Sequence, residues 1–549
     1  MLSKSKINIK LVGFVLFTII IVLQAVSLIY MGAQKEGMHI DDNYSYILSN
    51  SYDSTKIAND SESWNKWLSG EDFDKFVTVE KGEQFSYSKV YVNNTYDAHP
   101  PMFYFLLHTV SSFFPGQYTP WFGLGLNITL ILATQVLLFF FAKEITGSTL
   151  WGCVPVAIYG GMQVFFDTTI FIRMYPLVTL LTVLLVWKHY HFINNPQRRS
   201  TIVWCASIVF LGVFTQYYFA FVSFFLALAT CIFLMKRKEW KTLFIYAGAL
   251  IGAVACVFLV YPAGITQITG SETNNVGKAV MGGLFDFSRL FSSSVTMVKS
   301  AFDIMLPAVF NVLIPIGCLI VLTIVLSFVF RKKGQMKSLK VKECAKEMLP
   351  FGVLFVILVL CVVTVSHISA QFLYVRYIFN LFPLFILFAS VVLYKVINWI
   401  GWNKTIAALG ILVFWVVSTL GLVQENRCSY LMTRQAASDK EMIEKIDDRP
   451  LVVLNNGTTY QPTSLLNYLR DSEQVFMANY DEFENRDECF SQVDCSEGVV
   501  FIVLTDTYWS EGYDGGEVMT DIVSNTDFFD EYIQLGECNF STVYLAYNN

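Results

Sequence analysis

Two neighbouring carboxylates are the first residues in this chain whose types and spacing suggest chemistry. Asp41 and Asp42 stand side by side in "MHIDDNYSYIL", just after a long apolar stretch. Adjacent carboxylates repel each other, so one of them can hold a raised pKa and serve as a general base. A structural interpretation remains open, because an aspartate at the start of a helix also caps its first amide groups.

Two arginines suggest a second kind of chemistry. Arg173 in "TIFIRMYPLVTLL" and Arg376 in "FLYVRYIFNLFPLFIL" each stand at the start of an apolar run, close to Tyr175 and Tyr377 respectively. A guanidinium group binds phosphate through two parallel hydrogen bonds. The alternative is that both arginines only anchor their helices by reaching toward lipid headgroups.

A third polar group opens the apolar stretch "DAHPPMFYFLLH". Asp97 and His99 precede a Pro-Pro step, and His108 lies further along the stretch. Proline suits the first turn of a helix, and an anion is favoured before that positive end. The helical part after Pro101 has only about 14 residues, fewer than the ~20 that a spanning helix needs. We therefore expect an interfacial helix. The two histidines could relay protons, bind a metal ion, or simply be hydrogen-bonded.

The composition is that of a membrane protein. The 549 residues are 54% hydrophobic and 15% charged, whereas soluble domains are about 25% charged. The charge is uneven, because residues 424–549 hold 24 Asp+Glu and 7 Lys+Arg, which leaves the rest of the chain net basic. This imbalance predicts a domain boundary near residue 424, and nothing in it suggests nucleic-acid binding.

Hydropathy and basic clusters together predict the topology. An N-terminus with Lys4, Lys6 and Lys10 is expected in the cytoplasm, and the first span is not cleaved. With "DAHPPMFYFLLH" outside the bilayer, every later basic cluster falls on the cytoplasmic side. Eleven spans are then predicted, at 11–30, 120–142, 149–166, 175–190, 201–214, 217–235, 242–262, 305–330, 348–366, 377–395 and 405–423.

The predicted architecture has two parts. Residues 1–423 form a transmembrane catalytic domain, whose large first extracytoplasmic loop, 31–119, carries juxtamembrane helices. Residues 424–549 form a small extracytoplasmic α/β domain, because runs such as "PLVVLNN", "QVFMANY", "GVVFIVLTDT" and "STVYLAYN" alternate with helix-like pieces. Four cysteines in this domain permit two disulfides, and Cys489 with Cys495 is the simplest pair by spacing. No cysteine spacing resembles a zinc site.

Five stretches, in this order, resemble segments of a known family. "HIDD" resembles a first-loop acidic motif that is usually Asp-Glu, and "DAHPPMFYFLLH" resembles "HPPLYYLLLH". "IRMYPLVTLL", "LGVFTQYYFAF" and "RYIFNLFPLFILFA" resemble "ARMYALLLLL", "LGLLTHYYGLL" and "RYLLPLLPLLLLLA". Together they cover about 38–390. The family is the polytopic GT-C glycosyltransferase superfamily, in particular the protein O-mannosyltransferase and aminoarabinose transferase group (glycosyltransferase family 39-like).

The resemblance implies transfer of a sugar from a polyprenyl-phosphate carrier to an acceptor hydroxyl of a glycan, lipid or protein outside the cytoplasm. It implies that a first-loop acid is the base; Asp41 is favoured, although Asp42 stands where the family has Glu. The arginines matched by Arg173 and Arg376 would hold the carrier phosphate. Residues expected to line the site are His39, Asp97, His99, Tyr175 and Tyr377. Gln216 replaces the histidine of the family's "THYY", which puts any role there in doubt.

No metal ion or other cofactor is expected to be required, although some members of the superfamily use a divalent metal. A polysaccharide polymerase or ligase would use similar lipid-linked sugars, but its large outer loop usually comes late in the chain. A lipid or solute transporter would show repeats and mid-membrane charges, and neither is evident. A sensor or assembly scaffold would leave the acidic, "HPP" and arginine motifs unexplained.

Overall fold

The computed structural model divides the chain into two compact units, each of which is described by itself. The first unit comprises Met1–Gln34, Ala98–Met102 and Leu124–Ser429, and the second comprises Lys35–Asp97, Phe103–Gly123 and Tyr430–Asn549. The residues that the structure describes are 9–51, 64–196, 198–270, 277–278, 282, 286–305, 341–457, 460–484, 486–505 and 512–548.

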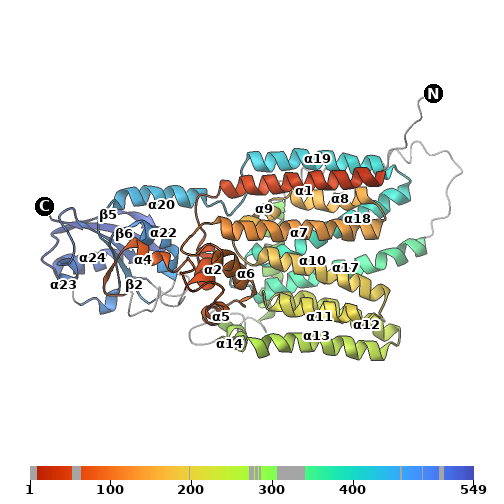
Figure 1. Ribbon diagram of the computed structural model, residues 1–549, viewed down its shortest axis with the longest axis horizontal. Coiled ribbons are helices and arrows are strands. Elements are labelled where there is room, and N and C mark those ends of the chain that lie inside the picture. The colour runs from red at the N-terminus through yellow and green to blue at the C-terminus, as the bar shows by residue number, and fades with distance from the viewer. Residues whose placement is uncertain are drawn as a thin grey trace, which may run out of the picture. The chain divides into compact units, whose positions relative to one another are not determined.

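The first unit consists of long apolar helices (Figure 1). Eight helices of the described ranges are long and apolar enough to cross a membrane, and a bent pair, α8 with α9, makes up to nine. The helices and 3-10 turns are α1 (Ile9–Ala33), α7 (Trp121–Thr146), α8 (Thr149–Gly160), α9 (Gln163–Ile170), α10 (Tyr175–Asn194), α11 (Arg199–Val213), α12 (Phe219–Lys236), α13 (Trp240–Val260), α14 (Ala263–Thr269), η1 (Phe287–Arg289), α17 (Val341–Ile368), η2 (Val375–Leu381), α18 (Phe382–Ile400) and α19 (Lys404–Gln424).

This architecture confirms the predicted polytopic helical membrane protein. Ten of the predicted spans coincide with helices of the first unit, although α11 has only 15 residues and is shorter than a full span. The remaining predicted span, 305–330, lies almost wholly outside the described residues. The chain therefore has the multi-pass pattern that its hydropathy indicates.

The bend between α8 and α9 shapes the region that precedes Arg173. The two helices are inclined by 68° at a break of two residues. At the end of α8, Gly160 allows the close approach of α1, because a Cβ there would lie 1.8 Å from Nε2 of Gln24. That same amide donates a hydrogen bond of 2.9 Å to the carbonyl of Val156. The short helix α9 then leads directly into the turn that carries Arg173.

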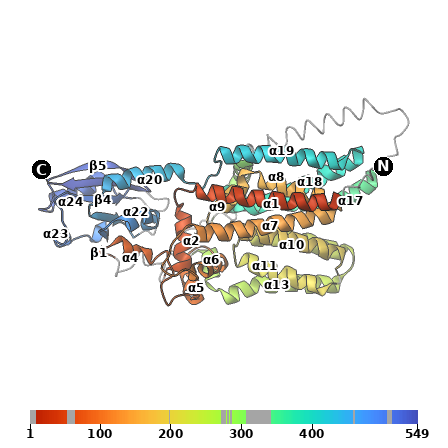
Figure 2. The same ribbon diagram turned by 45° about the horizontal axis from the view of Figure 1, so that its top comes forward.

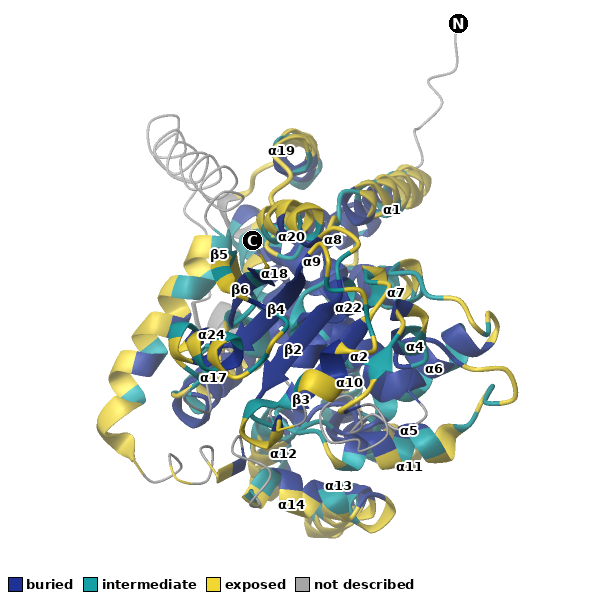
Figure 3. Cartoon of the chain, turned by 90° about the vertical axis from the view of Figure 1, so that its left-hand side faces the viewer, coloured by how far each residue is buried: buried dark blue, intermediate teal, exposed yellow. Residues whose placement is uncertain are grey.

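The second unit is built around a six-stranded sheet with the order β1-β3-β2-β4-β6-β5. Strands β2, β3 and β4 are parallel, while β1, β6 and β5 are antiparallel to their neighbours. The central strands are buried on both faces, as Figure 3 shows for β2 and β4. The elements are α2 (Ile40–Asn50), β1 (Trp67–Leu68), α4 (Gly70–Asp74), α5 (Tyr87–Thr95), α6 (Met102–Ser112), α20 (Thr433–Ile446), β2 (Leu451–Asn455), α21 (Tyr460–Ser464), α22 (Leu466–Asp471), β3 (Val475–Asn479), η3 (Tyr480–Glu482), α23 (Arg486–Phe490), β4 (Val499–Leu504), α24 (Gly515–Ser524), β5 (Glu531–Cys538) and β6 (Ser541–Tyr547).

The first loop supplies a strand to this sheet. In β1, Trp67 pairs with Phe476 of β3, and its indole nitrogen donates a 2.9 Å hydrogen bond to the carbonyl of Cys489. In α4, Asp74 forms a 2.6 Å ion pair with Arg470 of α22. The first loop was predicted to belong to the transmembrane domain, 1–423. In the structure most of it shares one compact unit with the C-terminal segment that begins at Tyr430.

The predicted α/β character of the C-terminal segment is confirmed. All four apolar runs are strands, namely β2, β3, β4 and β6, and the two helix-like pieces contain α22 and α24. The helix α20 lies against β5, as Figure 2 shows. The cysteines Cys428, Cys489, Cys495 and Cys538 are free thiols in the structure, so neither permitted disulfide is formed.

Candidate active site

The acid pair lies in the first turn of α2, and its backbone is fixed by a reciprocal cap. His39 is the N-cap residue and has an extended backbone. Its backbone amide donates a 2.9 Å hydrogen bond to Oδ2 of Asp42, and its ring nitrogen Nδ1 accepts a 3.1 Å bond from the amide of Asp41. The positive end of the helix favours both negative charges. The sequence "HIDD" therefore folds locally into a capping box.

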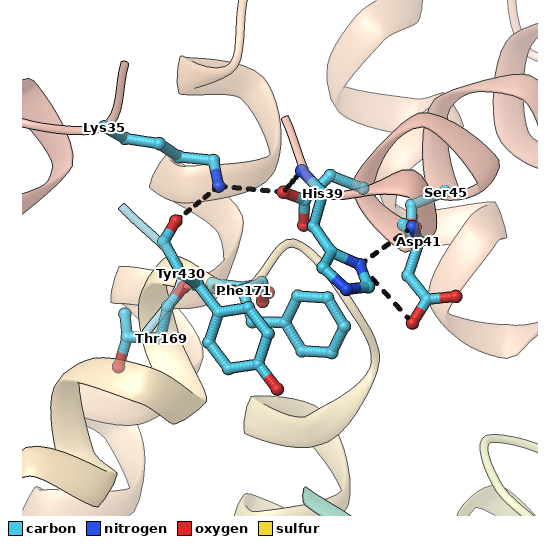
Figure 4. Close-up of polar contacts among 9 residues, drawn as sticks. Lys35, His39, Asp41, Ser45, Thr169, Phe171 and Tyr430 are labelled. Atoms are coloured by element: carbon cyan, nitrogen blue, oxygen red, sulfur yellow. Dashed lines mark hydrogen bonds and ion pairs between the residues drawn. The ribbon is translucent and has the colours of Figure 1, made fainter. Parts of the chain in front are cut away.

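Asp42 is buried in an ion pair. Its Oδ2 lies 2.8 Å from Nζ of Lys35, and the two side chains are 0% and 1% exposed. Lys35 Nζ also donates a 2.8 Å hydrogen bond to the backbone carbonyl of Tyr430 (Figure 4). A buried charge is tolerated only when a partner neutralises it. Asp42 is consequently a carboxylate whose charge is already compensated and whose side chain does not reach solvent.

Asp41 is placed differently from its neighbour. Its carboxyl group is 20% exposed, and its Oδ2 lies 3.6 Å from Nδ1 of His39 (Figure 4). Because Nδ1 accepts the backbone hydrogen bond of Asp41, it carries no proton there. The 3.6 Å approach is therefore a contact with a neutral imidazole and not an ion pair. The ring of His39 also packs edge-on against Tyr430, at 5.8 Å between ring centres.

Helix geometry explains this division. Successive residues of an α-helix point about 100° apart, so one acid of the pair faces the interior when the other faces outward. Asp42 stabilises the cap and Lys35, whereas the carboxyl group of Asp41 stays partly exposed.

In the first unit, Arg173 lies in the turn between α9 and α10. Its amide donates a 2.8 Å bond to the carbonyl of Phe171, and the side chain of Asn127 donates to the same carbonyl at 2.8 Å. The guanidinium is buried, with Nη2 3.3 Å from Nδ1 of His99. The structure thus brings together two of the residues that the sequence predicted, His99 and Arg173.

Arg376 lies in η2, before α18, among aromatic rings. Its guanidinium carbon stands 4.2 Å from the ring centre of Tyr374, 5.5 Å from that of Phe171 and 5.8 Å from that of Tyr377. Such contacts hold a guanidinium in place without neutralising its charge. Tyr175 stacks on Phe171, at 5.8 Å and 18°. Phe171 is therefore a common neighbour of Arg376, Tyr175 and the turn that carries Arg173.

Three other residues that were considered in the sequence, Asp97, His108 and Gln216, make contacts that are those of ordinary structural residues. Asp97 is half-buried just after α5, and its amide bonds the carbonyl of Asn94 at 3.2 Å. His108 is buried in α6, and this burial lowers its pKa, so the ring is neutral and packs edge-on against Tyr87. The predicted helix start after Pro101 is confirmed, because α6 begins at Met102. Gln216 is buried at a helix turn.

Two buried charged residues were not predicted from the sequence to have a role. Lys35 was not singled out, although it neutralises Asp42. Asp167, in α9, accepts hydrogen bonds from the amide of Ser429 at 2.6 Å, from its hydroxyl at 3.0 Å and from Gln163 at 3.3 Å. An acidic residue inside an apolar segment is itself a signal of a special role, and that signal would have identified Asp167.

The expectation that no metal ion is required is not tested by the structure. In the described part of the chain, no group of three or more His, Cys, Asp or Glu side chains is arranged to hold a metal ion. Whether the protein needs a divalent ion stays a prediction to be tested in solution.

Comparisons with known proteins find similarity among solved structures but not among family profiles or curated sequences. No protein-family profile and no curated protein sequence matches the chain. Among solved structures, the chain is similar to ArnT from Cupriavidus metallidurans bound to undecaprenyl phosphate, with 12% sequence identity, a TM-score of 0.48 and 97% of each chain covered. This similarity is too low to assign a function to the chain.

Proposed function

We propose that this protein is a membrane glycosyltransferase that moves a sugar from a polyprenyl-phosphate donor to an acceptor hydroxyl on the extracytoplasmic side. The observation that carries the proposal is the division of the acid pair. One carboxylate, Asp42, is buried and neutralised by Lys35, whereas Asp41, one residue earlier, is partly exposed beside a neutral His39.

In the proposed reaction, the Asp41 carboxylate takes the proton of the acceptor hydroxyl as its oxygen attacks the anomeric carbon of the sugar. The bond between that carbon and the phosphate oxygen breaks, and polyprenyl phosphate leaves with the electron pair. General base catalysis of this kind contributes typically 10²–10⁴-fold to a rate. The neutral ring of His39 supports Asp41, because its Nδ1 fixes the backbone of that residue.

The arginines fit the other half of the reaction. The guanidinium groups of Arg173 and Arg376 would bind the carrier phosphate and stabilise the charge that grows on it as it leaves. A phosphate leaving group needs no protonation by an acid, so cations suffice. Support for this role comes from their surroundings, an imidazole at 3.3 Å from Arg173 and aromatic rings around Arg376. His99 contacts Arg173 and Tyr377 lies beside Arg376. Tyr175, which stacks on Phe171, and Asp97 are further residues that we expect to contribute.

The topology proposed with this function puts the N-terminus in the cytoplasm and the C-terminal domain outside. The donor's polyprenyl tail would lie in the hydrocarbon layer, and the acceptor would approach from the extracytoplasmic side. Cysteine-labelling with a membrane-impermeant reagent on intact cells tests this orientation by comparing Ser496→Cys on the C-terminal domain with the unsubstituted protein, whose free thiols Cys428 and Cys495 set the background. Labelling only after the cells are broken would reverse the proposed orientation.

The test of the reaction compares two substitutions in membranes that contain polyprenyl-phosphate sugars. Asp41→Asn is expected to abolish transfer while the protein melts like the wild type. Asp42→Asn leaves Lys35 buried without its counter-charge, which costs about 3–5 kcal/mol, so this variant should lose stability as well as activity. Full transfer by a normally accumulated Asp41→Asn variant would show that Asp41 is not the base. Parallel assays with EDTA test the expectation that no divalent metal is needed.

A further inference from the structure

The residue that most needs an explanation beyond the proposed reaction is Lys35. It follows the first long helix, where a lysine usually reaches into water or toward headgroups. Here its side chain is 1% exposed, and its ammonium group contacts both the Asp42 carboxylate and the Tyr430 carbonyl at 2.8 Å. Removing an ammonium group from water is costly unless each contact is well made. The role of Lys35 is therefore to fix the positions of the Asp42 carboxylate and the Tyr430 carbonyl relative to each other.

The contacts of Lys35 join the acid pair to the C-terminal segment. Tyr430 is 395 residues away in sequence, at the start of the C-terminal part of the second unit. The neighbouring amide of Glu36 donates a 3.0 Å bond to the carbonyl of Leu431. Directly after Asp42, the side chain of Asn43 donates a 3.0 Å bond to the carbonyl of Thr463 in α21. The start of α2 is thus attached to the C-terminal segment on both sides of the acid pair.

We infer that Lys35 is a positioning residue, which uses the C-terminal domain as a fixed support to orient the first turn of α2 and hence Asp41. Oδ2 of Asp42 is shared between Lys35 Nζ and the amide of His39, and His39 in turn fixes the amide of Asp41. A continuous series of polar contacts therefore joins the Tyr430 carbonyl to Lys35, Lys35 to Asp42, and Asp42 to the N-cap of α2. This inference rests on the proposed function, because it takes Asp41 as the base.

The C-terminal domain is, on this inference, part of the catalytic machinery and not a separate binding module. The inference predicts a specific kinetic effect. A displacement of a catalytic group by about 1 Å can cost 10²-fold in rate. Binding of the donor would be unchanged, since the carrier phosphate is assigned to Arg173 and Arg376. Loss of Lys35 should therefore lower kcat about 100-fold and leave the KM for the donor unchanged.

The experiment uses the full chain and separates positioning from stability. Lys35→Met leaves Asp42 without its counter-charge and is expected to lose both stability and kcat. The double variant Lys35→Met with Asp42→Asn removes both charges and is expected to recover the melting temperature but not kcat. Lys35→Arg keeps the cation but places a larger group in the buried space, so it is expected to lose some stability. Where it folds, it should retain a kcat within about 10-fold of the wild type. The matched control is Lys89→Met, whose lysine pairs with Glu83 on a partly exposed part of the same loop.

Two outcomes would overturn the role of Lys35. The first is a double variant that regains both melting temperature and kcat, which would make the pair merely structural. The second outcome concerns Lys35→Arg and decides the matter if the double variant fails to fold. If Lys35→Arg folds normally but has a kcat as low as that of Lys35→Met, a cation at this position does not position the helix. Neither outcome touches the proposed function, which fails separately if Asp41→Asn transfers sugar at the normal rate.

Discussion

The contact between the first loop and the C-terminal segment can be tested at one glycine. Gly70 is the first residue of α4, and it lies against the backbone of α22. A Cβ added at Gly70 would stand 2.3 Å from the carbonyl oxygen of Arg470 and 2.7 Å from that of Ser472. Neither oxygen can rotate away, because both belong to the main chain. Gly70→Ala must therefore push the two segments apart by several tenths of an ångström or more.

Overpacking of this kind costs typically about 1–3 kcal/mol. For a unit of about 200 residues, each kcal/mol lowers the melting temperature by roughly 2–4 °C, so Gly70→Ala should melt about 2–12 °C below the wild type. Thermal unfolding is followed by circular dichroism, because the chain has 11 tryptophans and their fluorescence does not report on Trp67 alone. The control is Gly516→Ala near the start of α24, where a Cβ would meet only Oδ1 of Asp514, at 3.4 Å.

The same melts decide whether the reasoning holds. If Gly70→Ala and Gly516→Ala both melt within about 1 °C of the wild type, α4 does not rest on α22 in the native protein. The grouping of the first loop with the C-terminal segment would then be wrong. If only Gly70→Ala is destabilised and sugar transfer falls with it, the acid pair depends on that grouping.

Two further predictions concern charge. Arg173→Lys and Arg376→Lys should each raise the KM for the polyprenyl-phosphate donor by about 10- to 100-fold, because a lysine keeps the charge but loses the paired hydrogen bonds. The KM is measured by titrating the donor at a constant acceptor concentration, and an unchanged KM would contradict the phosphate-binding role. Burial alone would raise the pKa of Asp521, but hydrogen bonds from Arg486 and Tyr480 and the charge of Arg486 outweigh it and hold that pKa below its usual value. This carboxylate therefore stabilises the fold above about pH 4, and the stabilisation is lost as the pH falls through the lowered pKa. The difference in melting temperature between the wild type and Asp521→Asn should be full at pH 6 and shrink as the pH falls below about 4, and a difference that stays constant would refute the assignment.

The sequence was sufficient for elements that carry their own periodic or apolar signal. The buried strands β2, β3 and β4 are uninterrupted apolar runs, and the long helices are apolar throughout. The strand β5 was missed because it is an edge strand that is largely exposed and is interrupted by an irregularity at Gly536. The strand β1 has two residues and exists only because β3 is beside it. No local pattern can predict a strand that its partner defines.

The candidate residues divide in the same way. Arg173, Arg376 and the acid pair were found because charged residues beside apolar runs are conspicuous in a sequence. The role of Lys35 was not predicted, because a lysine next to a membrane span is common for reasons of topology alone. Its burial depends on a carbonyl that is 395 residues away. The pairing of Arg173 with His99 could be suspected from sequence, but the aromatic surroundings of Arg376 required the fold.

The acid pair shows how a repeated residue type acquires two roles. Two adjacent aspartates have the same intrinsic acidity, and the difference between them comes from the helix that begins at Ile40. That helix turns one carboxylate inward, where only a buried cation makes it tolerable, and leaves the other partly exposed. A glutamate in place of Asp42 would have to fit one more methylene group against Lys35 in a fully buried space. The length of the Asp42 side chain is thus matched to Lys35, and Asp42→Glu is expected to disturb the cap of α2.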